Sequence, residues 1–314
     1  MAYICMDRGT DKCPCALMEA GQCYTCSMIQ TGKCSCSCDW QGVCPYTEYK
    51  QRGSSVIEPK ETRNFVVAER HDFSPSLSVV TLKVPFAYST KCREKGAFMM
   101  VCKDQWQIPI SVMESYTVKE EEGLPEGRIK LAINAAGPKT IGLLKRCSAG
   151  SVWNVRGPYF TGLVRKEIYD PKALSIVAAK GIALMPLLNM KQEIGGNLAG
   201  FYLDRSKLPE EFESEYLSDL QYEEADLTYR IEETAENIHR SYKFCMESTD
   251  RKPNVFLMVS PYFLGRLTEL LDIDKREIIA PNHVNMCCGE GICGACSHTD
   301  AQGVTVRGCK CFDL

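Results

Sequence analysis

Residues 286–296 read MCCGEGICGAC, and this stretch gives the strongest indication of the fold. Three of its cysteines have the C-x4-C-x2-C spacing of plant-type [2Fe–2S] sites: Cys288, Cys293 and Cys296. A fourth thiol, Cys309, follows with twelve residues between. The interleaved glycines permit a tight loop around the inorganic core, whereas zinc usually takes paired C-x2-C knuckles. The sequence therefore predicts a [2Fe–2S] cluster on these four cysteines. Two spare thiols could replace a ligand in another register: Cys287 and Cys311.

Cysteine usage sets the whole chain apart. The 314 residues hold 19 cysteines, of which nine lie within residues 1–44, six within residues 287–311 and four in the 242 residues between. A secreted disulfide scaffold would be short and would carry a signal peptide. The first residues show no basic n-region and no apolar h-region, so we expect no signal peptide and a cytoplasmic location. Thiol ligation of metal in a reducing compartment explains this distribution better.

The N-terminal cysteines predict a second metal-binding unit over residues 1–52. The segment contains no histidine, so its ligands are all sulfur, which suits iron–sulfur clusters or zinc. Close-set pairs supply the candidate ligands: Cys13, Cys15, Cys23, Cys26, Cys34, Cys36, Cys38 and Cys44. Their number allows two four-ligand sites. Beside a [2Fe–2S] site, one or more electron-carrying clusters fit better than structural zinc, which stays open as the alternative.

The composition excludes several classes of protein. Hydrophobic residues make up 45% and charged residues 25%, which are ordinary values for a globular protein. The net charge of −3 leaves no basic field to hold nucleic acid or an anionic membrane. The longest apolar stretch, residues 173–188, is shorter than the roughly 20 residues of a membrane-spanning helix. We therefore expect neither nucleic acid nor a membrane as partner, and no motif indicates a catalytic side chain.

The hydrophobic pattern divides the rest of the chain into two domains. Residues 53–168 hold short β-rich runs between turn glycines, which predicts an antiparallel β-barrel. Its strands are expected over Asn64–Ala68, Leu77–Val84, Ala97–Cys102, Ile108–Met113, Arg128–Ala132 and Ser151–Val155, with a short helix over Thr140–Leu144. Residues 169–283 alternate strands and helices, which predicts a parallel sheet. Its helices are expected over Pro186–Glu193, Glu210–Leu220, Glu223–Tyr242 and Tyr262–Leu271. With residues 284–314 as the [2Fe–2S] unit, small Cys-rich units flank a two-domain centre.

This arrangement of barrel, α/β domain and terminal cluster motif resembles the electron-transfer subunit of dihydroorotate dehydrogenase. Sulfide dehydrogenase subunits and the small subunit of the bifurcating NADH-dependent ferredoxin:NADP oxidoreductase share the pattern, and all belong to the ferredoxin-reductase-like superfamily. The resemblance covers about residues 60–314 and is strongest at the cluster motif.

The resemblance implies a flavin-binding barrel that holds FAD. Residues 107–112, QIPISV, resemble the family's R-P-x-S-[IV] strand: Pro109 and Ser111 match, and Ile108 stands at the arginine position. Residues 136–140, AGPKT, resemble the turn that contacts the FAD diphosphate. The matching or phosphate-facing positions there are Gly137, Lys139 and Thr140. Two further stretches resemble barrel motifs: Gly96–Met99 and Arg156–Tyr159.

The same comparison implies an altered nicotinamide site. The family's glycine-rich loop corresponds to residues 178–186, AAKGIALMP, which keep Gly181 and Pro186 but place alanines and Lys180 where glycines let the backbone approach pyrophosphate. The family's C-G-P motif corresponds to residues 259–261, VSP. We expect NAD(P) to bind weakly or not at all, although Lys180 as a direct phosphate ligand stays open.

These features predict an iron–sulfur flavoprotein that relays electrons between FAD, its clusters and a larger flavoenzyme subunit of an oxidoreductase complex. A ferredoxin is a second candidate partner. Two alternatives remain: a self-sufficient NAD(P)H-dependent flavin reductase, and a non-catalytic assembly subunit with partly lost cofactor sites.

Overall fold

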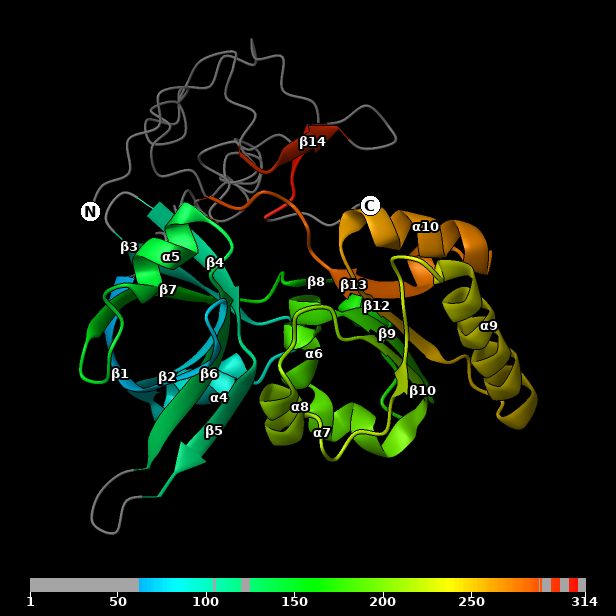
Figure 1. The fold of residues 1–314 in the computed structure, drawn as a ribbon, viewed down its shortest axis with the longest axis horizontal. Helices are drawn as coiled ribbons and strands as arrows, with labels where there is room; N and C mark the ends of the chain where they lie inside the picture. Colours follow the sequence, from blue (N-terminus) through cyan, green and yellow to red (C-terminus); the bar gives the residue numbers. More distant parts are fainter. Residues whose placement is uncertain are drawn as a thin grey trace, which may run out of the picture. The chain divides into compact units, whose positions relative to one another are not determined.

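The computed structural model describes residues 62–103, 106–119, 125–287, 289, 295–299 and 305–309 (Figure 1). Residues 63–283 form one compact unit, and residue 62 with the described residues from 284 onward belongs to a second. The first unit contains a barrel and an α/β domain. The second contributes a short hairpin that carries two of the predicted cluster ligands.

The barrel is a seven-stranded sheet within the described residues, in the order β4-β3-β7-β1-β2-β6-β5. Neighbouring strands run antiparallel in the pairs β1–β2, β2–β6, β5–β6, β3–β4 and β3–β7. The strands are β1 (Thr62–Ser74), β2 (Leu77–Pro85), β3 (Phe98–Lys103), β4 (Trp106–Ser111), β5 (Glu114–Val118), β6 (Glu126–Asn134) and β7 (Val152–Tyr159). Two short helices accompany them: α4 (Phe86–Cys92) and α5 (Pro138–Leu144).

The sheet closes at the corner between β4 and β5. The Val112 N–H donates to the Ala97 carbonyl at 2.9 Å, beside the start of β3, and the next N–H, of Met113, donates to the Lys130 carbonyl of β6 at 2.9 Å. One corner of the chain is thereby bonded to strands near both edges of the sheet. This closure is that of a barrel, as the sequence predicts.

The α/β domain is built on a six-stranded sheet of the described chain, in the order β11-β10-β9-β12-β13-β8. All its pairs are parallel except β13–β8. The strands are β8 (Leu163–Val164), β9 (Ser175–Lys180), β10 (Leu198–Asp204), β11 (Glu223–Glu224), β12 (Asn254–Met258) and β13 (Ile278–Pro281). The helices are α6 (Met185–Leu188), α7 (Lys191–Ile194), α8 (Glu210–Tyr216), α9 (Ile231–Ser248) and α10 (Pro261–Leu271), with 3-10 turns η1 (Lys166–Ile168), η2 (Gly181–Leu184), η3 (Gly195–Asn197) and η4 (Lys275–Glu277).

Helices cover both faces of this sheet. Figure 1 shows α9 and α10 on one side and α6, α7 and α8 on the other. The chain leaves β9 for β10 on one side and later returns to β12 on its other side. The strand order therefore reverses at β9, and in open α/β sheets the crevice outside the carboxyl ends of the strands at such a reversal is where ligands bind.

The barrel and the α/β domain share one hydrophobic core. Phe73 of β1 packs edge-on against Phe212 of α8, with ring centroids 5.3 Å apart, and against Tyr216 at 5.9 Å. All three side chains are at least 92% buried and belong to the cluster that also contains the β9 and β12 side chains. This shared core explains why residues 63–283 form a single unit.

Three expected helices differ from the observed ones. Of residues 223–242, Glu223 and Glu224 form strand β11, and the helix begins only at Ile231. Asp226 explains this late start, because its carboxylate accepts the N–H groups of Thr228 and Tyr229 at 3.1 and 3.0 Å and holds them in a turn. The expected helix over Pro186–Glu193 is two short helices, α6 and α7, and that over Glu210–Leu220 ends at Tyr216.

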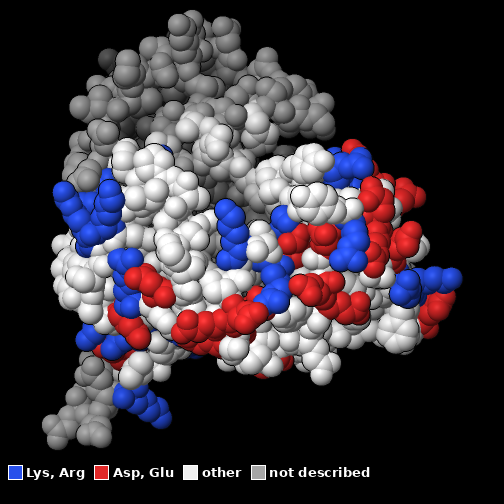
Figure 2. Space-filling model, viewed as in Figure 1, with Lys and Arg blue, Asp and Glu red and all other residues white. Residues whose placement is uncertain are grey.

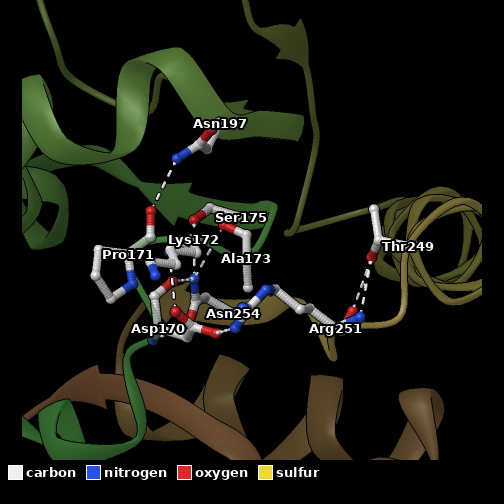
Figure 3. Close-up of polar contacts among 9 residues, drawn as sticks. All are labelled: Asp170, Pro171, Lys172, Ala173, Ser175, Asn197, Thr249, Arg251 and Asn254. Carbon is white, nitrogen blue, oxygen red and sulfur yellow. Dashed lines mark hydrogen bonds and ion pairs between the residues drawn. The ribbon is translucent and has the colours of Figure 1, made fainter.

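Polar contacts hold the segment that leads from the barrel into β9 (Figure 3). Arg251 donates to the Asp170 carboxylate at 2.7 Å, and the same carboxylate accepts the Lys172 N–H at 2.9 Å. The backbone bond from Lys172 and the bond from Arg251 lower the pKa of Asp170 below its usual value. Asn197 donates to the Pro171 carbonyl at 3.1 Å. The entry to β9 is thus anchored at the amino end of the sheet, opposite the crevice.

Charged side chains of both signs are interspersed on the face drawn in Figure 2. Ion pairs among the described residues include Lys95–Glu193 at 2.9 Å and Lys191–Asp219 at 2.8 Å. No helix among the described residues is both long enough and apolar enough to span a membrane.

Candidate functional site

The hairpin of the second unit brings two predicted cluster ligands together. Strands β14 (Ser297–Thr299) and β15 (Thr305–Arg307) pair antiparallel, so the residues that flank them meet at the open end. Cys296 directly precedes β14, and Cys309 follows β15 with one residue, Gly308, between them. Their Sγ atoms lie 3.2 Å apart, both residues are at least 96% buried, and no disulfide joins them.

Glycine shapes this end of the hairpin. The Gly308 N–H donates to the Cys296 carbonyl at 3.0 Å, which fixes the backbone beside Cys309. A Cβ added at Gly308 would lie 2.4 Å from Cγ1 of Val284, so only glycine fits without a shift. Gly289, in the predicted cluster loop, has a φ of +68°, which glycine adopts readily.

The paired thiols fit a metal centre. Two thiolates on one tetrahedral ion, with metal–sulfur bonds of about 2.3 Å, lie about 3.8 Å apart. The observed spacing of 3.2 Å between Cys296 and Cys309 needs only a small opening to reach that value. The other predicted ligands lie outside the described residues: Cys288, Cys293, Cys13, Cys15, Cys23, Cys26, Cys34, Cys36, Cys38 and Cys44. Within the described part of the chain, no three potential ligands converge on one point.

A cavity of about 470 Å³ lies at the carboxyl ends of the parallel strands, between the barrel and the α/β domain. The barrel contributes three hydroxyl or amide side chains to its wall: Ser76, Ser111 and Asn134. The α/β domain contributes the ends of β9, β10, β12 and β13 with their following turns: Lys180, Gly181, Ser206, Lys207, Ser260, Phe263, Pro281 and His283. The cavity therefore occupies the crevice expected where the strand order reverses.

Strand β4 places two of the predicted flavin residues on its outer face. Ile108 and Ile110 point into the barrel core and are 5% and 7% exposed. By alternation Pro109 and Ser111 share the opposite face, where Pro109 is exposed and Ser111 reaches the cavity. Ile108, at the family's arginine position, thus faces the core and cannot contact a ligand on the outer face.

The other predicted flavin residues lie at the start of α5. Gly137 is the N-cap residue, and the Thr140 hydroxyl donates to its carbonyl at 3.2 Å. Lys139 is exposed, and a Cβ added at Gly137 would meet nothing within 4 Å. That open space leaves room for a ligand to approach the backbone.

The two groups of flavin residues sit toward opposite ends of β4. Helix α5 lies beside Trp106, the first residue of the strand, because a Cβ added at Gly142 would be 3.3 Å from its ring. Ser111 is the last residue of β4, about 17 Å further along at 3.4 Å per residue. The structure does not gather these residues at one point: Trp106 packs against the barrel core, whereas Pro109 and Ser111 lie on the other face of β4.

The altered nicotinamide loop carries an ion pair. Lys180 ends β9 and its ammonium contacts the carboxylate of Asp204, the last residue of β10. The chain then enters the 3-10 turn η2, in which Gly181 is the first residue, at a φ of +51°. The loop keeps Gly181 but lacks the other glycines that bring the backbone close to a pyrophosphate, and Lys180 pairs with the nearby acid.

His283 follows β13 and lines the same cavity. Burial lowers the pKa of its imidazole, and a hydrogen bond to the Val259 backbone opposes that shift only in part. Its Nε2 is buried and makes no hydrogen bond to any residue that the structure describes. Ser260, at the position of the family's altered motif, is the exposed N-cap residue of α10. We expect His283 to be neutral near pH 7.

Two polar links were not predicted from the sequence. The first is the pair of Lys180 with Asp204. A signal was present, since an acidic residue at the end of the second parallel strand of such a sheet often binds a ribose. The other is buried Arg156 of β7, which donates to Gln107 of β4 at 2.5 Å and to the Tyr159 hydroxyl at 2.8 Å. No local pattern in the sequence indicates that pairing, because it joins strands far apart in the chain.

Comparison with known proteins identifies the fold. No protein-family profile and no curated protein matches the sequence. Among solved structures, the chain is similar to an NADH-dependent reduced ferredoxin-NADP oxidoreductase of flavin-based electron bifurcation, with 14% identity over 79% of this chain and 86% of that one, and a TM-score of 0.56. Phthalate dioxygenase reductase matches at 14% identity over 79% and 94% of the two chains, with a TM-score of 0.50. An intact type IV self-sufficient cytochrome P450 monooxygenase matches at 13% identity over 81% of this chain and 41% of that one, with a TM-score of 0.50. These likenesses confirm the predicted pair of domains, and the chain has the fold of the ferredoxin–NADP reductase-like flavin- and nucleotide-binding proteins.

Proposed function

We propose that the protein is an iron–sulfur flavoprotein subunit that transfers electrons within an oxidoreductase complex. One observation carries the proposal: Cys296 and Cys309 hold their sulfurs 3.2 Å apart, buried and without a disulfide, in a chain with a ferredoxin-reductase-like fold. Two buried thiols at that spacing suit ligation of one metal ion. The spacing of Cys288 and Cys293 in the same loop supports them as the remaining ligands of a [2Fe–2S] cluster.

The barrel is the proposed FAD site. Ser111 and Pro109 on the outer face of β4 would flank the ring system, while Gly137, Lys139 and Thr140 at the start of α5 would lie beside the diphosphate. When bound, FAD exchanges electrons in pairs or singly and the cluster carries one at a time, so together they convert between the two modes. The chain's own part is to bind, space and shield these groups, since no acid–base side chain is assigned to bond making.

The partner in this proposal is a larger flavoenzyme subunit of the dihydroorotate dehydrogenase or sulfide dehydrogenase type, with a ferredoxin as the second candidate. Two structural neighbours support an electron-transfer role: the ferredoxin-NADP oxidoreductase is described as electron-bifurcating, and phthalate dioxygenase reductase as moving electrons from pyridine nucleotides to [2Fe–2S]. Residues 1–52 would add at least one further cluster, with zinc as the alternative metal, and the complex would act in the cytoplasm.

Anaerobic purification of the full chain, followed by analysis of iron, acid-labile sulfide, zinc and flavin, tests this function. We expect one FAD and more than two metal atoms per chain, and a chain that starts at Gly53 should retain only the two irons of the C-terminal cluster. The Cys296→Ser variant should lose the [2Fe–2S] electron-resonance signal of reduced protein. The matched control is Cys245→Ser, since Cys245 is buried in α9 and has no predicted metal role.

Three results would redirect the proposal. An unchanged resonance signal in Cys296→Ser would remove the cluster assignment. Iron-replete protein without flavin would favour the non-catalytic assembly subunit instead. Rapid bleaching of bound flavin by micromolar NADH would favour a self-sufficient flavin reductase.

A further inference from the structure

The ammonium of Lys180 occupies a fully built polar site at the carboxyl end of β9. It contacts a carboxylate oxygen of Asp204 and donates to the Thr228 hydroxyl at 3.1 Å. The same ammonium lies 5.1 Å from the centre of the Phe263 ring, within the range of a cation–π contact. The Lys180 side chain is only 19% exposed, so these contacts are largely shielded from water.

Asp204 has no accepting position left for a ligand on the side that faces Lys180. Its Oδ2 accepts both the lysine ammonium and the Leu227 N–H, the latter at 2.9 Å. Its Oδ1 accepts the Ser206 N–H at 3.1 Å. The carboxylate is 9% exposed, and buried charges with this many partners are costly to separate.

Lys180 and Asp204 lie where related sheets bind a dinucleotide. In doubly wound sheets the acid at the end of the second strand hydrogen-bonds a ribose hydroxyl, and the turn after the first strand holds the pyrophosphate. Here β9 is the first strand and β10 the second, and Lys180 and Asp204 are their last residues. The lysine therefore contacts the one acid that a dinucleotide would use, from the turn where its pyrophosphate would lie.

We propose that Lys180 is an internal occupant of the ribose site and the residue that makes this crevice reject dinucleotides. Removal of its side chain exposes Asp204, whose carboxylate accepts from a 2′-hydroxyl and repels a 2′-phosphate. The opened site then selects NAD-type over NADP-type ligands. This proposal depends only on the fold and contacts of the α/β domain. It can therefore be wrong while the proposed FAD and cluster sites are right, and it can be right while they are wrong.

Equilibrium binding to the full-length holoprotein tests the inference with ADP-ribose and 2′-phospho-ADP-ribose as probes. Neither probe carries nicotinamide, so the readout is independent of electron transfer. Lys180→Ala should bind ADP-ribose at least tenfold more tightly than the wild type and should prefer it to the phosphorylated probe. Adding Asp204→Asn should cancel the gain. Lys172→Ala is the matched control and should leave binding unchanged, because its exposed side chain lies at the amino end of the sheet, opposite the cavity.

Two results with Lys180→Ala would overturn the proposal. If Lys180→Ala binds ADP-ribose no better than the wild type, the lysine is not what excludes the ligand, and the proposal is wrong. If it binds less well, Lys180 is a phosphate ligand, which also overturns the proposal. Should the single variant fail to fold with an unpaired acid, Lys180→Ser keeps a small polar group but vacates the place of the ammonium, and it should still bind ADP-ribose more tightly than the wild type.

Discussion

The side-chain amide of Asn254 forms hydrogen bonds with both the N–H and the carbonyl of Asp170. Its Oδ1 accepts the Asp170 N–H at 2.9 Å and its Nδ2 donates to the Asp170 carbonyl at 2.8 Å (Figure 3). Asn254 is the first residue of β12 and is 5% exposed, while Asp170 lies in the segment that enters β9. One side chain thus ties the barrel-to-sheet connection to the central strands, far from the cavity at their other end.

Substitution Asn254→Ala should destabilise the first unit without disturbing the cavity. It leaves the part-buried N–H and carbonyl of Asp170 without their partner, and the expected loss in free energy of unfolding is about 1–3 kcal/mol. Urea unfolding followed by circular dichroism measures it. Arg251→Ala, which removes only a half-exposed ion pair to the same Asp170, should change the stability much less. Equal losses in the free energy of unfolding in the two variants would show that the hydrogen bonds of the Asn254 amide are not the main stabilising contact.

Local patterns in the sequence were sufficient for some elements and not for others. The cysteine spacing and the apolar runs of β2, β9 and β12 are local signals. The spacing predicted that Cys296 and Cys309 come together, and the apolar runs predicted these strands. Strand β5 is half-exposed and polar, and β11 consists of two exposed glutamates, so neither carries a hydrophobic pattern. Their positions are set by pairing with β6 and β10. Likewise, no local pattern predicts that Asp204 meets a lysine 24 residues away, because β9 and β10 must first pair.

Substitution Gly308→Ala should weaken cluster retention. The new Cβ would lie 2.4 Å from Cγ1 of Val284, whose branched side chain has few rotamers in which to give way. The hairpin end must then shift and carry Cys309 with it. Iron content and the resonance signal after gel filtration measure the loss. The double variant Gly308→Ala/Val284→Ala restores the space and should recover iron; if it does not, the contact with Val284 is not the reason for the glycine.

Substitution Gly137→Leu should lower FAD affinity and leave the fold intact. Gly137 has an extended backbone that any residue adopts, and the direction of its Cβ is open, so the protein itself has no steric need for glycine. A bulky side chain would instead fill space beside the proposed diphosphate. We expect at least a tenfold weaker Kd for FAD, measured by flavin fluorescence. Gly196→Leu, where an added Cβ likewise meets nothing, is the control. Unchanged affinity would place the diphosphate elsewhere.

Substitution His283→Gln should flatten the dependence of stability on pH below neutrality. Burial lowers the pKa of His283 in the folded protein, whereas in the unfolded chain it returns to about 6.5. Between pH 7 and pH 5 the unfolded chain therefore takes up a proton that the folded protein refuses, so the wild type loses stability as the pH falls. Glutamine can still donate to the Val259 backbone but does not titrate. Unfolding free energies measured at several pH values should differ in slope between the two proteins by up to one proton, with the wild type steeper. Parallel slopes would mean that the imidazole has the same pKa in the folded protein as in the unfolded chain, so that its burial does not shift its titration.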